Sequence, residues 1–251
     1  MRIAVGVMTI NRDTVNYLAG TLASLQSTSE HLSHSVLVCV GNADTSHIED
    51  LTSVSVIPRQ FIDKMPGRGV LYAITANMAH TYEALLTREP KADLFLVIED
   101  DIAFARKWTT VIEKLATMAS SRSHNWVLSL CTSHNDDAFS PVAPGLWQHR
   151  RALDFWGQQA LVYPPTTFRR MRQHVHTCER EWEPSTPTSR VPHNPNDARQ
   201  GDQAIKWFCH VNNVPIYVPN PSVVNHVGQK CSWGQGADSE AWRNRTRRFV
   251  P

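Results

Sequence analysis

Short apolar segments alternate with amphipathic stretches over the first half of the chain, and this alternation constrains the fold more than any other feature. The apolar segments indicate buried strands. They lie at residues 3–10, 35–40, 54–57, 93–98 and 126–130. Between them, apolar side chains recur at helical spacing, most clearly over residues 69–88. Strands that alternate with helices predict an α/β fold whose sheet is mainly parallel and has helices on both faces.

The second half of the chain is less regular. Residues 159–163 are expected to form a strand that stops at two prolines, and a helix follows to about residue 182. Residues 184–197 contain four prolines and predict a loop long enough to act as a lid. A helix over about 202–212 and a strand over 215–218 are expected next.

Composition places the chain among ordinary globular domains. Its 25 Lys and Arg residues against 23 Asp and Glu give a formal charge of +2, which excludes bulk coating of nucleic acid but allows a local basic patch. No segment reaches the ~18 apolar residues that cross a bilayer. The five cysteines are scattered without a C-x-x-C pair. This pattern favours reduced thiols in a cytosol-like compartment and argues against a structural zinc site.

Three adjacent carboxylates, Glu99-Asp100-Asp101, directly follow the expected strand at 93–98. They repel one another, and a hard divalent cation such as Mg²⁺ or Mn²⁺ would relieve that repulsion because it prefers oxygen ligands. The alternative is a helix N-cap, since a helix is expected within a few residues. One acid suffices for a cap, so three acids leave both interpretations open.

Three further positions allow a functional and a structural interpretation. His226 follows a turn-rich passage and is either a metal ligand or a solvated histidine. Asp202 begins a helix after the proline-rich loop, where it is either a general base at the rim of a cleft or an N-cap. At Trp156-Gly157 the glycine allows close approach of a ligand and the indole can stack on a sugar ring; the alternative is a core aromatic residue.

A histidine pair in the second half also has the composition of a metal cluster. His174 and His176 lie close to Cys178 in an expected helix. Residues two apart on a helix point in different directions, so this pattern favours a solvated helix face.

The order of the motifs resembles the GT-A glycosyltransferases, and most closely the N-acetylglucosaminyltransferase IV-like group with its bacterial and phage relatives. In that group Glu-Asp-Asp stands for the Asp-x-Asp metal motif, as at residues 99–101 here. A C-terminal Pro-Ser-x-x-x-His-x-Gly segment is similar to Pro-Ser-Val-Val-Asn-His-Val-Gly at residues 221–228. The first strand ends in Thr-x-Asn-Arg, and the likeness spans residues 3 to about 234.

This resemblance implies a single domain over residues 1–251 with the GT-A, Rossmann-like architecture: a mixed, mainly parallel sheet with flanking helices. Residues 1–130 would form the nucleotide-sugar-binding half and residues 131–235 the acceptor-binding half. Residues 236–251 would form a basic C-terminal tail.

The resemblance also implies a role for each matched residue. Asp101 and His226 would bind Mn²⁺ or Mg²⁺, which would bridge the diphosphate of a nucleotide sugar, expected to be a UDP-sugar. Asp202 would deprotonate the acceptor hydroxyl and so lead to inversion; the family's base motif is usually Glu-Asp or Asp-Asp, whereas this chain has Gly-Asp-Gln. The residues expected to contact the donor are Thr9, Asn11, Arg12, Arg68, Glu99, Asp100, Trp156 and Gly157.

The acceptor stays open between a hydroxymethylated pyrimidine in DNA, which phage relatives of this fold modify, and a glycan or protein. Two arginine clusters are compatible with DNA, one at residues 169–172 and one at residues 243–248. Each cluster is alternatively a solvated helix face or terminus. The competing functions are a catalytically inactive nucleotide-sugar-binding module and a nucleic-acid-binding module without chemistry. A bacterial or phage-infected host cytosol, with no membrane partner, is the expected location.

Overall fold

The computed structural model describes residues 1–9, 16–28, 34–40, 48, 55–58, 69–131, 138–155, 159–181 and 201–227. Its strands are β1 (Ile3–Thr9), β2 (His34–Val40), β3 (Ser55–Pro58), β4 (Leu94–Glu99), β5 (Ile102–Phe104), β6 (Val127–Ser129), β7 (Phe139–Ala143), β8 (Leu146–His149), β9 (Ala160–Tyr163), β10 (Ile216–Pro219) and β11 (Val224–His226). Its helices are α1 (Leu18–Thr28), α2 (Gly69–Arg88), α3 (Trp108–Ser120), α4 (Pro165–Glu181), α5 (Gly201–Val211) and the 3-10 turn η3 (Ala152–Asp154).

Nine of these strands form one sheet, in the order β3-β2-β1-β4-β9-β6-β10-β8-β7. The pairs β2–β3, β1–β2, β1–β4 and β6–β10 are parallel, whereas β9 pairs antiparallel with both β4 and β6. Only β8 and β9 run against the other strands of this sheet, so it is mixed and mainly parallel, which confirms the prediction. The carboxyl ends of the majority strands meet at one edge, which we call the carboxyl edge.

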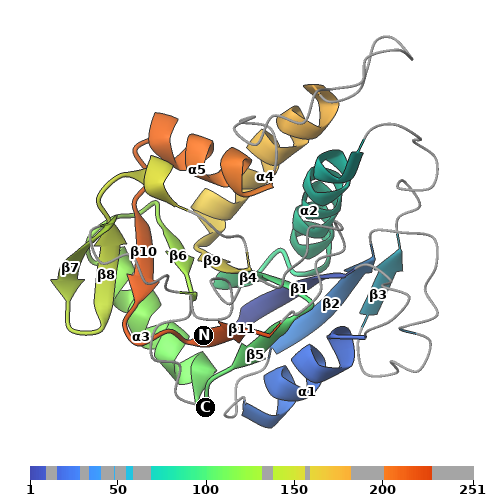
Figure 1. Cartoon of the computed structure of the whole chain (residues 1–251), viewed down its shortest axis with the longest axis horizontal. Coiled ribbons are helices and arrows are strands. Elements are labelled where there is room, and N and C mark those ends of the chain that lie inside the picture. Colours follow the sequence, from blue (N-terminus) through green and yellow to red (C-terminus); the bar gives the residue numbers. More distant parts are fainter. Residues whose placement is uncertain are drawn as a thin grey trace.

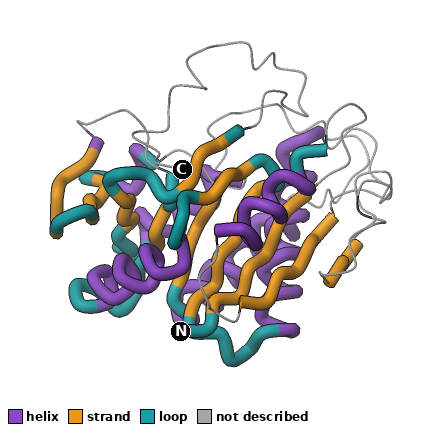
Figure 2. The backbone as a smooth tube through the Cα atoms, turned by 90° about the horizontal axis from the view of Figure 1, so that it is seen from below, coloured by secondary structure: helices purple, strands orange, loops and turns teal. Residues whose placement is uncertain are grey.

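Helices cover both faces of the sheet (Figure 1). Ile3, Val5 and Val7 of β1 belong to the core that contains α1 and α3. Ala4 and Met8 belong to the core that contains α2, α4 and α5. The tube in Figure 2 shows the same arrangement from a second direction, with the strands side by side between helices. Because both faces are buried, β1 is a continuous apolar run without polar alternation.

Gly6, in the middle of β1, lies where α2 comes close to the sheet. A Cβ atom built at Gly6 would lie 2.7 Å from Thr81 Cγ2 and 2.8 Å from Leu85 Cδ1. Both distances are shorter than van der Waals contact, so a side chain here would force Thr81 and Leu85, or α2 itself, to shift. Glycine therefore permits the observed spacing between this helix and this strand.

Four short strands, β5, β7, β8 and β11, are not predicted by the sequence patterns. β7 and β8 form a hairpin that extends the sheet beyond β10. β5 and β11 pair antiparallel as a separate two-stranded ribbon, with His226 opposite Ile102. At 3 residues each, β5 and β11 are too short to show a period, and only tertiary pairing brings them together.

The direction of β9 also differs from a purely parallel arrangement. β9 follows the β7–β8 hairpin in the chain and enters the sheet between β4 and β6, antiparallel to both. An apolar segment indicates that a strand is buried, but the same residues suit either direction, so the sequence pattern does not determine this insertion.

Cys39, Cys131, Cys178 and Cys209 are free thiols, and Cys231 lies outside the described residues. Burial raises the pKa of the Cys39 thiol to about 11, although a hydrogen bond with Thr81 acts against the shift. This thiol therefore stays protonated and weakly nucleophilic near neutral pH. Among the described helices, none combines the length and hydropathy needed to cross a bilayer.

Candidate metal centre at the carboxyl edge

The three acidic residues lie in the tight connection between β4 and β5, at the carboxyl edge. Glu99 is the last residue of β4 and is half-buried, whereas Asp100 and Asp101 are only 2% and 6% exposed. The buried residues Ile98 and Ile102 hold the two ends of this connection in the core shared with α1 and α3. Two neighbouring carboxylates are thus kept out of water, which is costly unless each finds a compensating partner.

Asp100 faces the interior of the protein. Its Oδ2 accepts a hydrogen bond of 2.6 Å from the Thr9 hydroxyl at the end of β1. Its carbonyl oxygen accepts one of 2.7 Å from the Thr21 hydroxyl of α1, and Thr21 Oγ1 in turn accepts the N–H of Ile102 at 3.0 Å. The structure therefore brings the predicted residues Thr9 and Asp100 together, as a buried pair that fixes the acidic connection.

Asp101 and His226 meet although they are 125 positions apart in the sequence, and the β5–β11 ribbon is the reason. His226 lies opposite Ile102 in this ribbon, and Val227 donates its N–H to the Asp101 carbonyl at 2.8 Å. His226 Nε2 then lies 3.1 Å from Asp101 Oδ2. Ligand atoms of Glu99, Asp101 and His226 all lie within 4.8 Å of one another. We call these three residues the edge cluster.

Two observations indicate that a divalent cation fits the edge cluster. Asp101 Oδ1 is buried and has no hydrogen-bond partner among the described residues. A buried carboxylate oxygen without a partner costs free energy, and a cation bound there would remove that cost. The donor set of two carboxylates and one imidazole nitrogen suits Mn²⁺ and other first-row ions, and its oxygens also suit Mg²⁺.

Asp202 lies in the first turn of α5 and is half-buried. The helix begins one residue earlier, and the N–H of Gly201 donates to the Thr75 hydroxyl of α2 at 3.1 Å. A side chain of α2 therefore accepts a hydrogen bond from one of the backbone N–H groups that have no partner within α5. Lys206 lies one turn after Asp202; burial lowers its pKa, and the carboxylates of Asp202 and Asp154 act against that shift.

Helix α2 connects this helix start to the carboxyl edge. Asn77 lies two residues after Thr75 in α2. Its Nδ2 donates a hydrogen bond of 3.4 Å to the carbonyl of Thr9, at the end of β1. The start of α5 and the end of β1 therefore contact the same part of one helix. Asp202 is not among the described residues whose ligand atoms converge in the edge cluster. The predicted base and the predicted metal ligands thus form separate parts of this region.

Three residues of this region, Thr21, Thr75 and Asn77, are absent from the sequence-based site. Each is buried and lies inside a helix. Their distinguishing feature is a polar side chain on a buried helix face, but the sequence pattern alone does not reveal what they contact.

Several predicted donor-binding residues fall outside the described part of the chain. They are Asn11, Arg12, Arg68, Trp156 and Gly157. The proline-rich segment 184–197 and the arginines of residues 243–248 fall outside it too. Their roles stay predictions.

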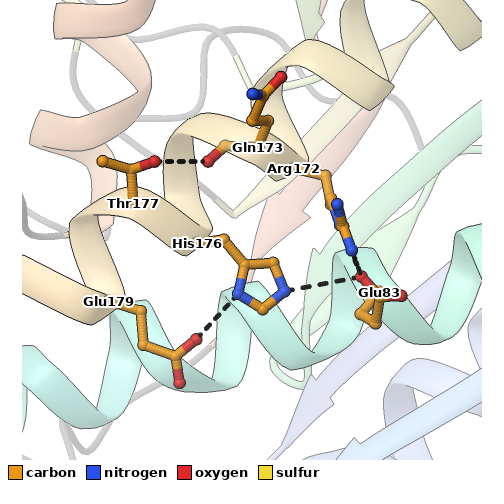
Figure 3. A network of polar contacts seen from close by, with 6 residues as sticks. All are labelled: Glu83, Arg172, Gln173, His176, Thr177 and Glu179. Atoms are coloured by element: carbon orange, nitrogen blue, oxygen red, sulfur yellow. Dashed lines mark hydrogen bonds and ion pairs between the residues drawn. The ribbon is translucent and has the colours of Figure 1, made fainter.

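The two histidines of α4 are half-buried and contact neighbouring side chains and backbone. His174 Nε2 lies 3.1 Å from the carbonyl of Ala204 in α5, and Cys178 is buried. His176 lies between two carboxylates: its Nε2 is 3.6 Å from Glu83 of α2 and its Nδ1 is 3.3 Å from Glu179 (Figure 3). Tertiary packing of α4 against α2 and α5 creates these contacts, and a helical repeat within α4 cannot indicate them.

The arginine cluster of α4 is also largely engaged within the protein. Arg172 forms an ion pair with Glu83. Arg170 donates to Asn212 Oδ1 at 2.6 Å, and its guanidinium lies 5.6 Å from the ring centre of Phe208. Arg169 is exposed. Two of the three side chains that are compatible with phosphate binding thus stabilise the contacts of α4.

Comparison with known proteins supports the fold. No protein-family profile and no curated protein sequence matches the chain. TarS of S. aureus superimposes with a TM-score of 0.52 and 13% identity, over 91% of this chain and 37% of TarS.

Two further solved structures superimpose with TM-scores of 0.48. Mannose-1-phosphate geranyltransferase from Thermus thermophilus shares 15% identity, over 87% of this chain and 73% of its own. CMP:2-keto-3-deoxy-manno-octonic acid synthetase complexed with CTP shares 11% sequence identity, over 87% of this chain and 89% of its own. At 13% identity, the likeness to TarS concerns the fold alone. The chain therefore has a mixed, mainly parallel α/β fold of the GT-A type.

Proposed function

We propose that this chain is a metal-dependent glycosyltransferase that moves a sugar from a nucleotide-sugar donor, a UDP-sugar, to an acceptor hydroxyl. The observation that supports it best is the edge cluster, in which the buried Asp101 Oδ1 has no hydrogen-bond partner among the described residues. The cluster lies at the carboxyl edge of an open α/β sheet, which is where such sheets bind their ligands. In this proposal residues 1–130 bind the donor and residues 131–235 bind the acceptor.

The edge cluster would hold Mn²⁺ or Mg²⁺ through Asp101 and His226, with Glu99 beside them. When bound, the cation supplies positive charge opposite the diphosphate of the departing nucleotide. Asp100 and Thr9 would hold the acidic connection in place through their buried hydrogen bond and would lie against the donor. Asn11, Arg12, Arg68, Trp156 and Gly157 complete the proposed donor contacts.

Asp202 would accept the proton of the acceptor hydroxyl as the oxygen attacks the anomeric carbon. The new glycosidic bond forms while the bond to the nucleotide diphosphate breaks, so the configuration inverts. Lys206 lies one turn along α5 and interacts electrostatically with Asp202.

The acceptor is proposed to be either a hydroxymethylated pyrimidine in DNA or a glycan or protein, as for the N-acetylglucosaminyltransferase IV-like group and its phage relatives. Arg169 and Arg170 are both exposed, but Arg170 also bonds to Asn212, and Arg172 pairs with Glu83. Any DNA contact by this cluster would therefore rest on Arg169, and on Arg170 where its side chain leaves Asn212.

A nucleotide-release screen tests the proposal. The purified protein is incubated with a panel of nucleotide sugars and with Mn²⁺, Mg²⁺ or EDTA. Hydroxymethylcytosine DNA, plain DNA or simple saccharides serve as acceptors. We expect metal-dependent release from a UDP-sugar, stimulated by one acceptor class.

Matched variants identify the residues involved. Asp101→Asn and His226→Gln should abolish release, whereas Asp93→Asn should not, because Asp93 lies at the opposite end of β4 and is exposed. Asp202→Asn should lower transfer by about 10²-fold or more while donor binding persists. Donor binding without release in any condition would favour the inactive module, and equal release in EDTA would rule out the metal role.

A further inference from the structure

A cavity lies at the carboxyl edge, beside the end of the β5–β11 ribbon that is farther from the edge cluster. Its volume is about 410 Å³. It is enclosed by the start of α3, by the turn between β7 and β8 at Pro144-Gly145, and by residues 219–223, which connect β10 to β11. This volume lies within the range of roughly 300–1,000 Å³ that is typical of small-molecule sites. We call it the α3 pocket.

The ribbon fixes where this pocket lies relative to the edge cluster. At one end of the ribbon Val227 bonds to Asp101, and at the other end the N–H of Ala105 donates to the Val223 carbonyl at 2.9 Å. Ala105 and Val223 line the pocket. The extended chain between Asp101 and Ala105 spans roughly 13 Å. None of the edge-cluster residues lines the α3 pocket, so it is a separate site.

The lining of the pocket combines an apolar wall with two cations. Val111 and Leu115 of α3 and three prolines supply apolar surface. Arg106 and Lys114 are both exposed and also line the pocket, and no carboxylate or histidine does. Neither cation has an ion-pair partner among the described residues.

These properties define the ligand that the pocket fits. An apolar body gains free energy when it leaves water for the apolar wall. An anionic group beside Arg106 and Lys114 gains charge-assisted hydrogen bonds that a neutral group lacks. We propose that the α3 pocket binds a small amphiphile, with its apolar body in the cavity and one phosphate or carboxylate held by Arg106 and Lys114. This site is independent of the proposed sugar transfer.

Isothermal titration calorimetry with three probes tests the proposal. Octyl phosphate carries both the apolar body and the anion, octanol carries the body alone, and inorganic phosphate carries the anion alone. All are used below the concentration at which octyl phosphate forms micelles. We expect one molecule of octyl phosphate to bind per chain, about tenfold or more tightly than either partial probe.

Charge-removing variants locate the site. Lys114→Gln and Arg106→Gln should each weaken octyl phosphate binding by about tenfold and leave octanol binding unchanged. Lys91→Gln is the matched control, because Lys91 is exposed and does not line the pocket. Thr110→Trp, which adds bulk at the exposed wall, should block octyl phosphate and octanol alike.

Four outcomes would overturn the proposal. Equal affinity for octanol would remove the anion requirement, and equal affinity for inorganic phosphate would reduce the pocket to a phosphate site. An equal loss in Lys91→Gln would indicate non-specific attraction to a basic surface. Binding of octyl phosphate by Thr110→Trp with wild-type affinity would place the ligand elsewhere.

Discussion

Two clusters of carboxylates around a histidine lie among the residues that the structure describes, and they differ in how their charges are compensated. The first is the edge cluster of Glu99, Asp101 and His226. The second, which we call the helix cluster, joins α2 to α4 and consists of Glu83, Arg172, His176 and Glu179 (Figure 3). Both place an imidazole within 3.6 Å of a carboxylate oxygen.

The helix cluster contains an arginine, which is always positively charged, whereas the edge cluster contains none. In the helix cluster Arg172 pairs with Glu83, and His176 bridges Glu83 and Glu179. In the edge cluster two carboxylates share one histidine, and a buried oxygen of Asp101 has no partner among the described residues. Similar residue types thus form a satisfied structural contact in one place and a candidate ligand site in the other. Charge compensation, rather than composition, distinguishes them.

The largest expected effect concerns metal affinity. Asp101→Asn should remove detectable Mn²⁺ binding by calorimetry, because it replaces a charged ligand at the centre of the edge cluster. Glu83→Gln, which removes a carboxylate from the helix cluster, should bind Mn²⁺ with wild-type affinity. If both variants lose binding equally, the distinction between the two clusters is wrong.

His149 extends the comparison to a histidine that is buried but belongs to neither cluster. His149 is 6% exposed and packs between Phe139 and Phe155, at ring-centre distances of 4.5 and 5.6 Å. Burial lowers its pKa from 6.5 to about 4, and the charge of Asp154 only partly opposes the shift. Between these pH values the unfolded chain binds a proton that the folded chain does not.

The free energy of unfolding should therefore fall as the pH drops from 6.5 to 4, by about 3 kcal/mol from this residue. Urea unfolding across this range measures it. In His149→Phe the free energy of unfolding should change less between these pH values. His124→Gln, at an exposed position, should keep the wild-type pH dependence. A wild-type slope that persists in His149→Phe would show that other groups cause the acid sensitivity.

The smallest expected effect concerns the helix cluster itself. The Arg172 and Glu83 side chains are 37% and 43% exposed, so water screens their ion pair. Arg172→Met should lower the free energy of unfolding by at most about 1 kcal/mol, and less in about 1 M salt. Arg169→Met on the same helix, also exposed, is the control. A loss far above 1 kcal/mol would mean that the helix cluster is as critical to stability as a buried ion pair.

The sequence predicts the central elements well because their signals are local. The apolar runs of β1 and β4 and the stripe of α2 fix strand and helix without knowledge of their partners. The same patterns identify neither the short ribbon strands nor the direction of β9, because those depend on pairing between distant segments.

The candidate site divides in the same way. Glu99, Asp100 and Asp101 are recognisable in the sequence because three acids follow a strand. Their different roles cannot be recognised in the sequence, because only the fold turns Asp100 toward Thr9 and Asp101 toward His226. Thr21 and Asn77 give no local signal, since a polar residue in a helix can face water or a distant backbone group with equal ease.

The sequence by itself determined where the apolar strands such as β1 and β4 lie and which acids could bind a cation, because apolar runs and adjacent carboxylates are local features of the sequence. Tertiary structure decided which acid keeps a buried oxygen without a partner among the described residues, which histidine joins it, and which histidines are held in packing contacts. Those outcomes depend on the pairing of β5 with β11 and on the packing of α2 against α4. Both bring together residues that are far apart in the chain.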